Sequence, residues 1–551
     1  MKLIRLIVFL FPLWCPAQTT KYFVKFTDKN NSPYSISNPS DFLSIRAITR
    51  RTRQGISIQQ NDIPVNRNYI DSVESKGAIV FTRSKWFNGV TIEADSATLQ
   101  AVLSLPFVQS SSPVNRIRSH AREEHEERNK FEVPLYNFKN TEPNIESVSY
   151  GQSYRQIHIM NGDVLHDSGY YGDNMIIALL DAGFYHVDVL SPFDSIRLNN
   201  RILDTWDFVA NESSVYEDYD HGMEVLSTIA GNVPGHLVGT APHASFLLLR
   251  TEDVFTEHRI EEYNWDAGAE FADSAGADVI STSLGYAENF TNPAENHTHA
   301  EMNGHTTVCA MAANIAFSKG MLVLASAGNS GGGAWQYIGT PADGDDVLAV
   351  GGVNLLGDYA SFSSTGPSAD GDIKPNVAAV GQTTTIVISD GSVTTGNGTS
   401  FACPVLAGSA TCLWQAFPDK TNREIFNAIQ QSGSQHNAPD SLLGYGIPDF
   451  LIAYMILRGS DLSITESDNL VSIYPNPFND FLAMKFYSLT DQEIHVEVFD
   501  AIGKKIFETQ SELGAKIFNT IPLPLTDLQK GIYFLRLTTE NDSFVKKVVK
   551  Y

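Results

Sequence analysis

The spacing of apolar residues changes twice along the chain and divides it into three parts. From 21 to 118, stretches of strand-like alternation are mixed with stretches of helical period. From about 146 to 458, unbroken apolar runs alternate with helical segments, as suits strands buried on both faces of a parallel sheet covered by helices. From 468 to 551, short segments alternate apolar and polar residues, which predicts a small antiparallel sandwich.

The N-terminal part predicts a compact α+β unit. Its strands are expected at 21–28, at 107–117 and twice within 78–94, around the turn pair Asn88-Gly89. Its helices are expected at 41–55, 65–77 and 95–106. The run SHAREEHEERNK that follows is charged and lacks apolar periodicity, which indicates an exposed linker and a cleavage region.

The central part predicts an α/β domain with a parallel sheet and helices on both faces. The expected strands are the runs NMIIALLD, ASFLLLR, ADVISTSLG, GMLVLASAGN and DVLAVGGV. Strands of this kind are joined by right-handed crossovers. Functional groups in such sheets gather at the carboxyl ends of the strands and at nearby helix N-termini.

Composition and charge narrow the class of function. The chain has 551 residues, 42% of them hydrophobic, and a formal net charge of −25, which argues against nucleic acid or an anionic membrane surface as a partner. Residues 21–118 are nevertheless basic, with 13 Lys+Arg and 7 Asp+Glu. This contrast predicts either two independently solvated surfaces or docking of the N-terminal block on the acidic remainder.

The first residues predict export. MKLIRLIVFLFPLWCPAQ has a basic start, an apolar centre and the small residue Ala17, the features of a secretory signal peptide cleaved near that position. The segment is too short for a stable membrane span, and no later segment is apolar enough for one. After signal removal Cys309, Cys403 and Cys412 remain, so at least one thiol is free.

Four polar residues stand at junctions of the predicted sheet. Asp181 ends NMIIALLD, His221 begins HGMEVLSTIAG, Asn329 ends GMLVLASAGN, and Ser400 begins a helical run within GTSFACPVLAG. A serine needs a base to take its proton, and a buried carboxylate orients that base. An asparagine and a backbone N–H can stabilise the developing oxyanion. The four residues therefore form a candidate set for acyl transfer.

The motifs around these residues resemble those of subtilisin-like serine peptidases, or subtilases. DAGF, HGMEVLSTIAG, DVISTSLGY, SAGNSGG and GTSFACPVLAG occur in the family's order, Asp-His-Ser, and the match covers roughly 146–458. The resemblance implies that Asp181 orients the general base His221, that Ser400 is the nucleophile, and that Asn329 donates to the oxyanion. It implies no organic cofactor, and structural calcium on family grounds only.

The resemblance also implies where a substrate would bind. An extended protein or peptide would add as a strand to Ser283, Leu284 and Gly285. The primary specificity pocket would be lined by Ala325, Ser326, Ala327 and Gly328.

Two positions depart from the family pattern. Met223 and Glu224 replace the usual Thr-His after His-Gly, and Cys403 replaces a serine. We expect neither change to affect a catalytic role, and we expect Cys403 to pack inertly rather than act as a rival nucleophile. Pro404 is expected in the first turn or so of the helix, where its missing N–H costs least. His297, His299, Glu301 and His305 match no strong zinc signature, so a solvated loop is expected there.

The same resemblance implies functions for the N-terminal and C-terminal parts of the chain. Residues 21–118 look like a subtilase propeptide, a ferredoxin-like inhibitor and folding chaperone. YPNPF, DAIGKK, GIYFLRL and VKKVVKY resemble the sorting domain read by the type IX secretion machinery. The predicted organisation is a signal peptide at 1–17, a propeptide at 20–120, a processing linker at 121–145, a catalytic domain at 146–458, a linker at 459–467 and a sorting domain at 468–551.

The sequence thus predicts a secreted or surface-attached serine endopeptidase, exported through the periplasm and held inactive by its own propeptide. Two alternatives remain. A catalytically silent subtilase-fold binding protein or adhesin would keep the fold for binding alone. The presence of the complete set Asp181, His221, Ser400 and Asn329 argues against this alternative. A lipase or esterase is opposed by the chain order of the triad and by the lack of a G-x-S-x-G elbow at Ser400.

Overall fold

A computed structural model describes residues 19–115 and 149–458, and most of 471–550 except 475–477, 479–481, 489–490, 515–516, 527 and 540–542. The predicted signal peptide, the run SHAREEHEERNK and the linker at 459–467 lie outside the described residues. The domain boundaries predicted within those segments therefore stay predictions.

The central part is built on a seven-stranded sheet in which all neighbouring strands are parallel, as predicted. The order across the sheet is β13 (Val377–Val380), β12 (Val347–Val353), β11 (Leu322–Ser326), β10 (Val279–Thr282), β5 (Ile176–Asp181), β9 (Ser245–Arg250) and β6 (Ile202–Asp207). Five of these strands are the predicted runs. β13, which is only four residues long, and the half-exposed edge strand β6 were not predicted, because neither gives a long apolar run.

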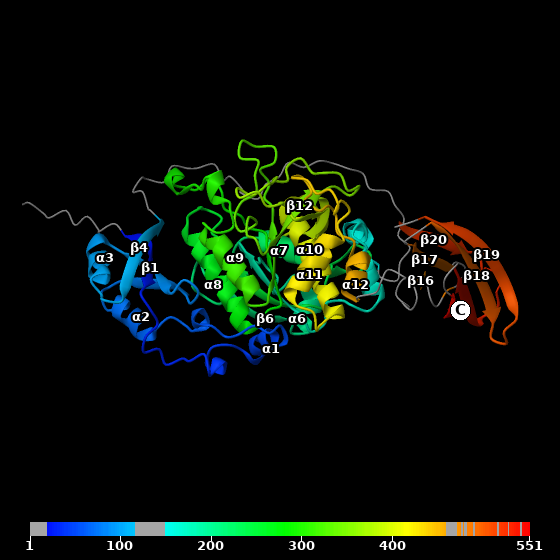
Figure 1. Cartoon of the computed structure of the whole chain (residues 1–551), viewed down its shortest axis with the longest axis horizontal. Helices are drawn as coiled ribbons and strands as arrows, with labels where there is room; N and C mark the ends of the chain where they lie inside the picture. The colour runs from blue at the N-terminus through cyan, green and yellow to red at the C-terminus, as the bar shows by residue number, and fades with distance from the viewer. Residues whose placement is uncertain are drawn as a thin grey trace, which may run out of the picture.

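Helices cover the sheet in two layers (Figure 1). α8 (Ile260–Ala275) packs with α9 (Val308–Ser318), and α7 (His221–Ala230) packs with α10 (Thr399–Ala416). Further helices and two hairpins, β7-β8 and β14-β15, complete the domain: α4 (Tyr154–His158), α5 (Asp163–Asp167), α6 (Asp194–Leu198), α11 (Asn422–Gln431), α12 (Phe450–Arg458), β7 (Asn232–Val233), β8 (Leu237–Val238), β14 (Gln382–Val387) and β15 (Val393–Asn397). The strands between the layers are buried, except for most of the edge strand β6 and the first residue of β9, Ser245.

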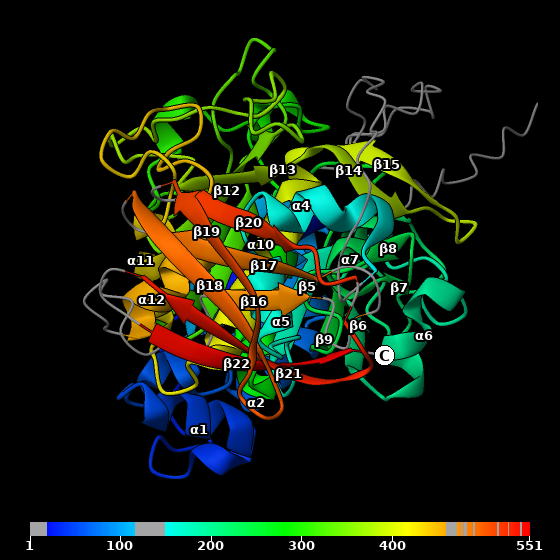
Figure 2. The same cartoon turned by 90° about the vertical axis from the view of Figure 1, so that its right-hand side faces the viewer.

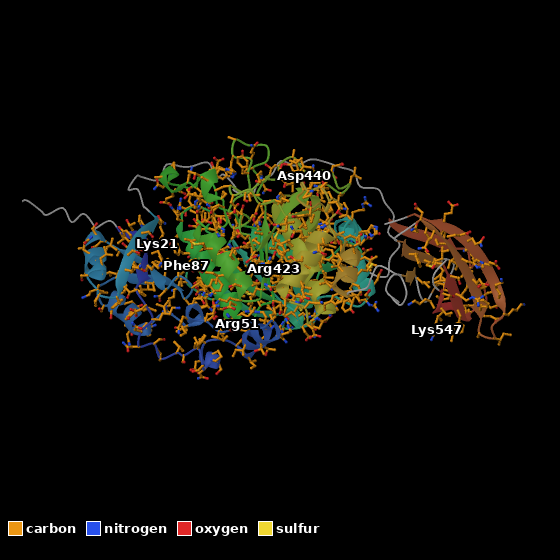
Figure 3. All side chains as sticks on the ribbon, viewed as in Figure 1. Lys21, Arg51, Phe87, Arg423, Asp440 and Lys547 are labelled. Carbon is orange, nitrogen blue, oxygen red and sulfur yellow. The ribbon has the colours of Figure 1, made fainter. Side chains whose placement is uncertain are left out.

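The N-terminal part has the predicted ferredoxin-like order β2-β3-β1-β4. Its elements are β1 (Thr20–Phe26), α1 (Ile45–Arg53), α2 (Arg67–Glu74), β2 (Ile79–Ser84), β3 (Gly89–Ala94), α3 (Ser96–Leu103) and β4 (Val108–Asn115). Successive residues of β1 face opposite sides: Val24 packs against α2 and α3, whereas Phe23 stacks on Tyr263 of α8 with ring centroids 4.3 Å apart. The unit therefore docks on the central domain through the free face of its sheet (Figures 1 and 3).

The C-terminal part is the predicted antiparallel sandwich (Figure 2). One sheet contains β16 (Val471–Tyr474), β17 (Leu482–Ser488) and β20 (Ile517–Leu523). The other contains β19 (Lys505–Leu513), β18 (Gln492–Asp500), β21 (Gly531–Thr538) and β22 (Ser543–Lys550). Met484 and Val496, from the two sheets, share one apolar core. Across the described residues, no helix is both long and apolar enough to cross a bilayer.

Candidate active site

Asp181 and His221 form a buried pair at the carboxyl edge of the sheet. Asp181 is the last residue of β5, the strand between β9 and β10 where the strand order reverses, and His221 is the first residue of α7. Asp181 Oδ1 accepts from His221 Nδ1 at 2.7 Å and from the Ala182 N–H, also at 2.7 Å. Because this bond engages Nδ1, the ring presents Nε2 as its other nitrogen for proton transfer.

Gly222 lets α7 approach β5 this closely. A Cβ at Gly222 would lie 2.4 Å from the Gly183 carbonyl oxygen and 2.9 Å from Asp181 Cβ. Any side chain there would push the helix, and His221 with it, away from Asp181. The glycine of the HGM segment is therefore a packing requirement of the His-Asp pair.

Ser400 is the second residue of α10, which packs directly against α7. Its Oγ donates to the Ser283 carbonyl at 3.4 Å, just after the end of β10. The neighbouring Phe401 ring lies 6.3 Å, centroid to centroid, from the His221 ring. The structure thus brings the predicted nucleophile and the predicted base together from segments almost 180 residues apart in the sequence.

Pro404 was expected in the first turn or so of the helix, but it lies in the second turn. It is the sixth residue of α10, where its missing N–H leaves the Ser400 carbonyl without its helical partner. The Ser283 hydroxyl donates to that carbonyl at 2.7 Å. Ser283 therefore contacts Ser400 twice, through its own carbonyl and through its hydroxyl, and the second contact was not foreseen.

Asn329 is oriented by the residue before the nucleophile. Its Oδ1 accepts from the Thr399 N–H at 2.9 Å and from the Thr399 hydroxyl at 3.0 Å. The place where a Cβ of Gly398 would lie is 3.6 Å from Asn329 Nδ2, 3.7 Å from Ser400 N and 3.8 Å from Ser400 Cβ. Two N–H donors and the serine thus surround one small space that the absent side chain leaves open.

The electrostatic setting favours a charged His221. Burial disfavours the imidazolium, but the carboxylates of Asp181, Glu224 and Asp220 outweigh it, so the pKa of His221 is raised above its usual value. Burial also raises the pKa of Glu224 to about 7. Glu224, which we expected to be irrelevant to catalysis, is therefore electrostatically linked to the predicted base.

The predicted substrate segments lie side by side. Ser283, Leu284 and Gly285 continue β10, and Ala325 to Gly328 complete and follow the adjacent parallel strand β11, with Thr282 opposite Ala325. Gly285 is exposed, and the next residue, Tyr286, exchanges two backbone hydrogen bonds with Thr340. Of the first segment, Gly285 therefore lies at the surface, whereas Ser283 and Leu284 are buried.

The predictions for Cys403 and for the segment around His297 have different outcomes. Cys403 is fully buried, burial raises the pKa of its thiol to about 12, and its Sγ donates to the Thr282 carbonyl at 3.6 Å, as suits an inert packing residue. The solvated loop predicted around His297 is wrong at that residue. His297 is buried, and its Nε2 lies 2.8 Å from Glu262 Oε1 on α8.

Comparisons with known proteins agree with this geometry. Residues 172–446 match the model of the subtilase family, residues 21–130 that of the peptidase S8 propeptide domain of Bacteroidota, and residues 472–551 that of a secretion system C-terminal sorting domain. The chain is 30% identical to subtilisin of Bacillus pumilus over 52% of its own length and 92% of that protein. It is also 30% identical to subtilisin E of Bacillus subtilis strain 168, over 52% and 67% of the two chains.

Proposed function

Because the chain belongs to the subtilase family and is a subtilisin-like serine endopeptidase, we propose that it hydrolyses peptide bonds through Asp181, His221 and Ser400. The observation that carries the proposal is the buried 2.7 Å contact between His221 and Asp181, beside helix α10, whose second residue is Ser400. A structure kept only for binding would have no need to bury this pair.

The proposed reaction begins when His221 accepts the Ser400 proton as Oγ attacks the scissile carbonyl. The resulting oxyanion would be stabilised by Asn329 Nδ2 and the Ser400 N–H, the two donors that face the space beside Gly398. His221 then protonates the leaving amine, and water hydrolyses the acyl-enzyme by the reverse sequence of proton transfers. Asp181 holds the imidazole orientation and stabilises the imidazolium throughout.

The flanking domains place this chemistry in an exported precursor. The N-terminal unit is a propeptide domain, and the C-terminal sorting domain indicates secretion or attachment at the cell surface. We propose that the propeptide inhibits its own catalytic domain until it is removed, and that the type IX secretion machinery reads the sorting domain.

Catalysis in this family needs no cofactor. Structural calcium stays a prediction, and the ligand chemistry of one cluster fits it. Glu252, Glu257 and Glu261 bring carboxylate oxygens within 4.8 Å of one another, and oxygen atoms are the ligands that Ca²⁺ prefers. The other cluster, His305, Asp345 and Asp370, includes an imidazole and fits calcium less well.

N-terminal sequencing and mass measurement of the exported protein test the proposal, with wild type and Ser400→Ala side by side. Wild type should lose the propeptide at a cut between residues 116 and 148, whereas Ser400→Ala should keep it. Identical cuts in both proteins, together with no peptidase activity in the processed wild type, would contradict the proposal.

A further inference from the structure

The propeptide contains a segment that lies outside its ferredoxin-like core. Residues 27–66, here called the clamp, are inserted between β1 and α2 and include α1. The core packs on the side of α8, but the clamp continues to the turns that precede the amino-terminal ends of β10, β5 and β11. Asp181 and Ser283 stand at the opposite, carboxyl-terminal ends of these strands. The clamp is therefore bound to the edge of the sheet that is remote from the catalytic residues.

Arginines of α1 make the clamp's contacts with this edge. Arg46 pairs with Asp278 and donates to the Asn174 carbonyl at 2.7 Å. Arg50 pairs with Asp273 at 2.6 Å and donates to the Ala277 carbonyl. These acceptors belong to the C-terminal end of α8 and to the turns that lead into β5 and β10.

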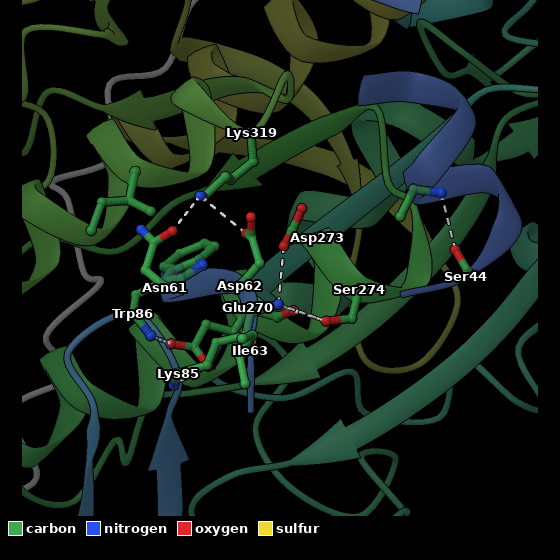
Figure 4. Close-up of polar contacts among 12 residues, drawn as sticks. Ser44, Asn61, Asp62, Ile63, Lys85, Trp86, Glu270, Asp273, Ser274 and Lys319 are labelled. Atoms are coloured by element: carbon green, nitrogen blue, oxygen red, sulfur yellow. Dashed lines mark hydrogen bonds and ion pairs between the residues drawn. The ribbon is translucent and has the colours of Figure 1, made fainter. Parts of the chain in front are cut away.

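A buried network of charges lies behind these contacts (Figure 4). Asp273 also accepts from Arg51 at 2.8 Å and from Lys85, on the turn after β2, at 3.0 Å. In the reverse direction, Lys319 of the catalytic domain pairs with Asp62 of the clamp at 3.0 Å. All of these side chains are at most 8% exposed. The propeptide therefore supplies cations that neutralise Asp273 of the catalytic domain, and the catalytic domain supplies Lys319, which neutralises Asp62 of the clamp.

A neutral contact extends the same surface. Gln54, at the end of α1, donates to the Gly320 carbonyl at 2.8 Å and accepts from the Asn422 N–H at 3.0 Å. Gly320 has a φ of 92°, which disfavours any other residue, and a Cβ there would lie 2.8 Å from Gln54 Nε2. Hydrogen bonding and charge thus match along the face of α1 that carries Arg46 and Arg50, and on to Gln54.

We infer that the surface formed by Asp273, Ala277, Asp278, Lys319 and Gly320 is a second binding site for the propeptide, separate from the catalytic residues, which recognises the arginine-bearing helix α1. The inference rests on the proposed function, in which the propeptide is cut from the catalytic domain. Because breaking a buried charge pair leaves a charge without compensation, this site holds the propeptide after the cut and slows its release.

Dissociation of the cut propeptide tests the inference without using the enzyme's own activity. The full chain carries Ser400→Ala and a site for a sequence-specific protease inserted between residues 130 and 131. After cutting, size-exclusion chromatography and a dissociation time course follow the N-terminal fragment. We compare Arg46→Met, whose side chain is partly exposed, and Gln54→Ala, which removes no charge, with the control Arg67→Met. Arg67 pairs with Asp71 at 2.7 Å inside the propeptide and is 58% exposed.

Both clamp variants should dissociate faster than the control, by about tenfold or more for Arg46→Met. Dissociation of both at the rate of Arg67→Met would overturn the inference. A wild-type enzyme without peptidase activity would contradict the proposed function but would leave this result unaffected, so the two failures are distinguishable.

Discussion

The contact between Ser283 and Ser400 links the nucleophile to the proline that follows it. Pro404 removes the helical hydrogen bond to the Ser400 carbonyl, and the Ser283 hydroxyl replaces it at 2.7 Å. The start of α10 is therefore held by the strand that carries the predicted substrate segment. A proline inside a helix, which is ordinarily destabilising, is compensated here by a side chain from another element.

Replacing Ser283 by alanine should leave the Ser400 carbonyl buried without a donor. We expect a loss of about 1–3 kcal/mol in the free energy of unfolding and a lower kcat. Pro404→Ala in the same chain restores a backbone N–H. The double variant should therefore regain much of the lost stability and much of the lost kcat. Urea unfolding and peptide hydrolysis measure the four members of this cycle. If the effects of the two substitutions on the free energy of unfolding simply add, the Ser283 hydroxyl and the backbone N–H at position 404 do not compete for the Ser400 carbonyl.

The electrostatics of His221 predict the pH dependence of activity. The imidazole must be neutral to accept a proton, and its pKa is raised above the usual 6.5. The kcat/KM should therefore fall as the pH drops, with a midpoint above 6.5. Glu224→Gln removes a carboxylate that favours the imidazolium, so the midpoint should move to lower pH. Equal midpoints for Glu224→Gln and for the exposed control Glu212→Gln would contradict this link.

At the residue scale, the sequence order and the strand ends were enough to predict Asp181, His221, Asn329 and Ser400 as neighbours of the sheet edge. The hydroxyl contact of Ser283 could not be predicted, because it depends on the register of α10 against β10. The burial of His297 was missed for a similar reason. Its partner, Glu262, is 35 residues away on α8. A comparison with metal-site spacings takes in only residues close in the sequence, so it could not identify this contact.

At the scale of elements, the packing of α7 on β5 sets the geometry of the candidate site. Gly222→Ala would place a Cβ within 2.4 Å of the Gly183 carbonyl oxygen, so α7 has to shift. We expect kcat/KM to fall by about 100-fold. The control is Gly332→Ala, where the nearest atom would be 3.9 Å from the new Cβ. Full activity in Gly222→Ala would show that the His-Asp pair tolerates the displacement.

Element types were predictable where the apolar pattern was long. The five unbroken runs became buried parallel strands, and the alternating C-terminal segments became a sandwich. β13 and β6 were missed because tertiary pairing, rather than their own sequences, makes them strands. The position of Pro404 was misjudged because the start of α10 lies at Thr399, and only a contact with Ser283 makes a proline at its sixth residue tolerable.

At the scale of the whole molecule, the charge contrast between the N-terminal block and the remainder left two interpretations open, independently solvated surfaces or docking, and ion pairs such as Arg50–Asp273 show docking. The place of docking was not predictable. Arg50 and Arg51 of α1 both pair with Asp273, more than 220 positions away, and no local pattern in the sequence identifies this partner. Net charge predicts that two surfaces attract, whereas the fold decides where they meet.

The central claim is that Ser400, and not the nearby Cys403, is the nucleophile. The most direct measurement is peptide hydrolysis by processed wild type, Ser400→Ala and Cys403→Ala, with each variant processed at an inserted protease site. We predict that Ser400→Ala lowers kcat/KM by about 10⁴-fold or more, whereas Cys403→Ala keeps most of the activity. Hydrolysis that persists in Ser400→Ala and is lost in Cys403→Ala would contradict the account.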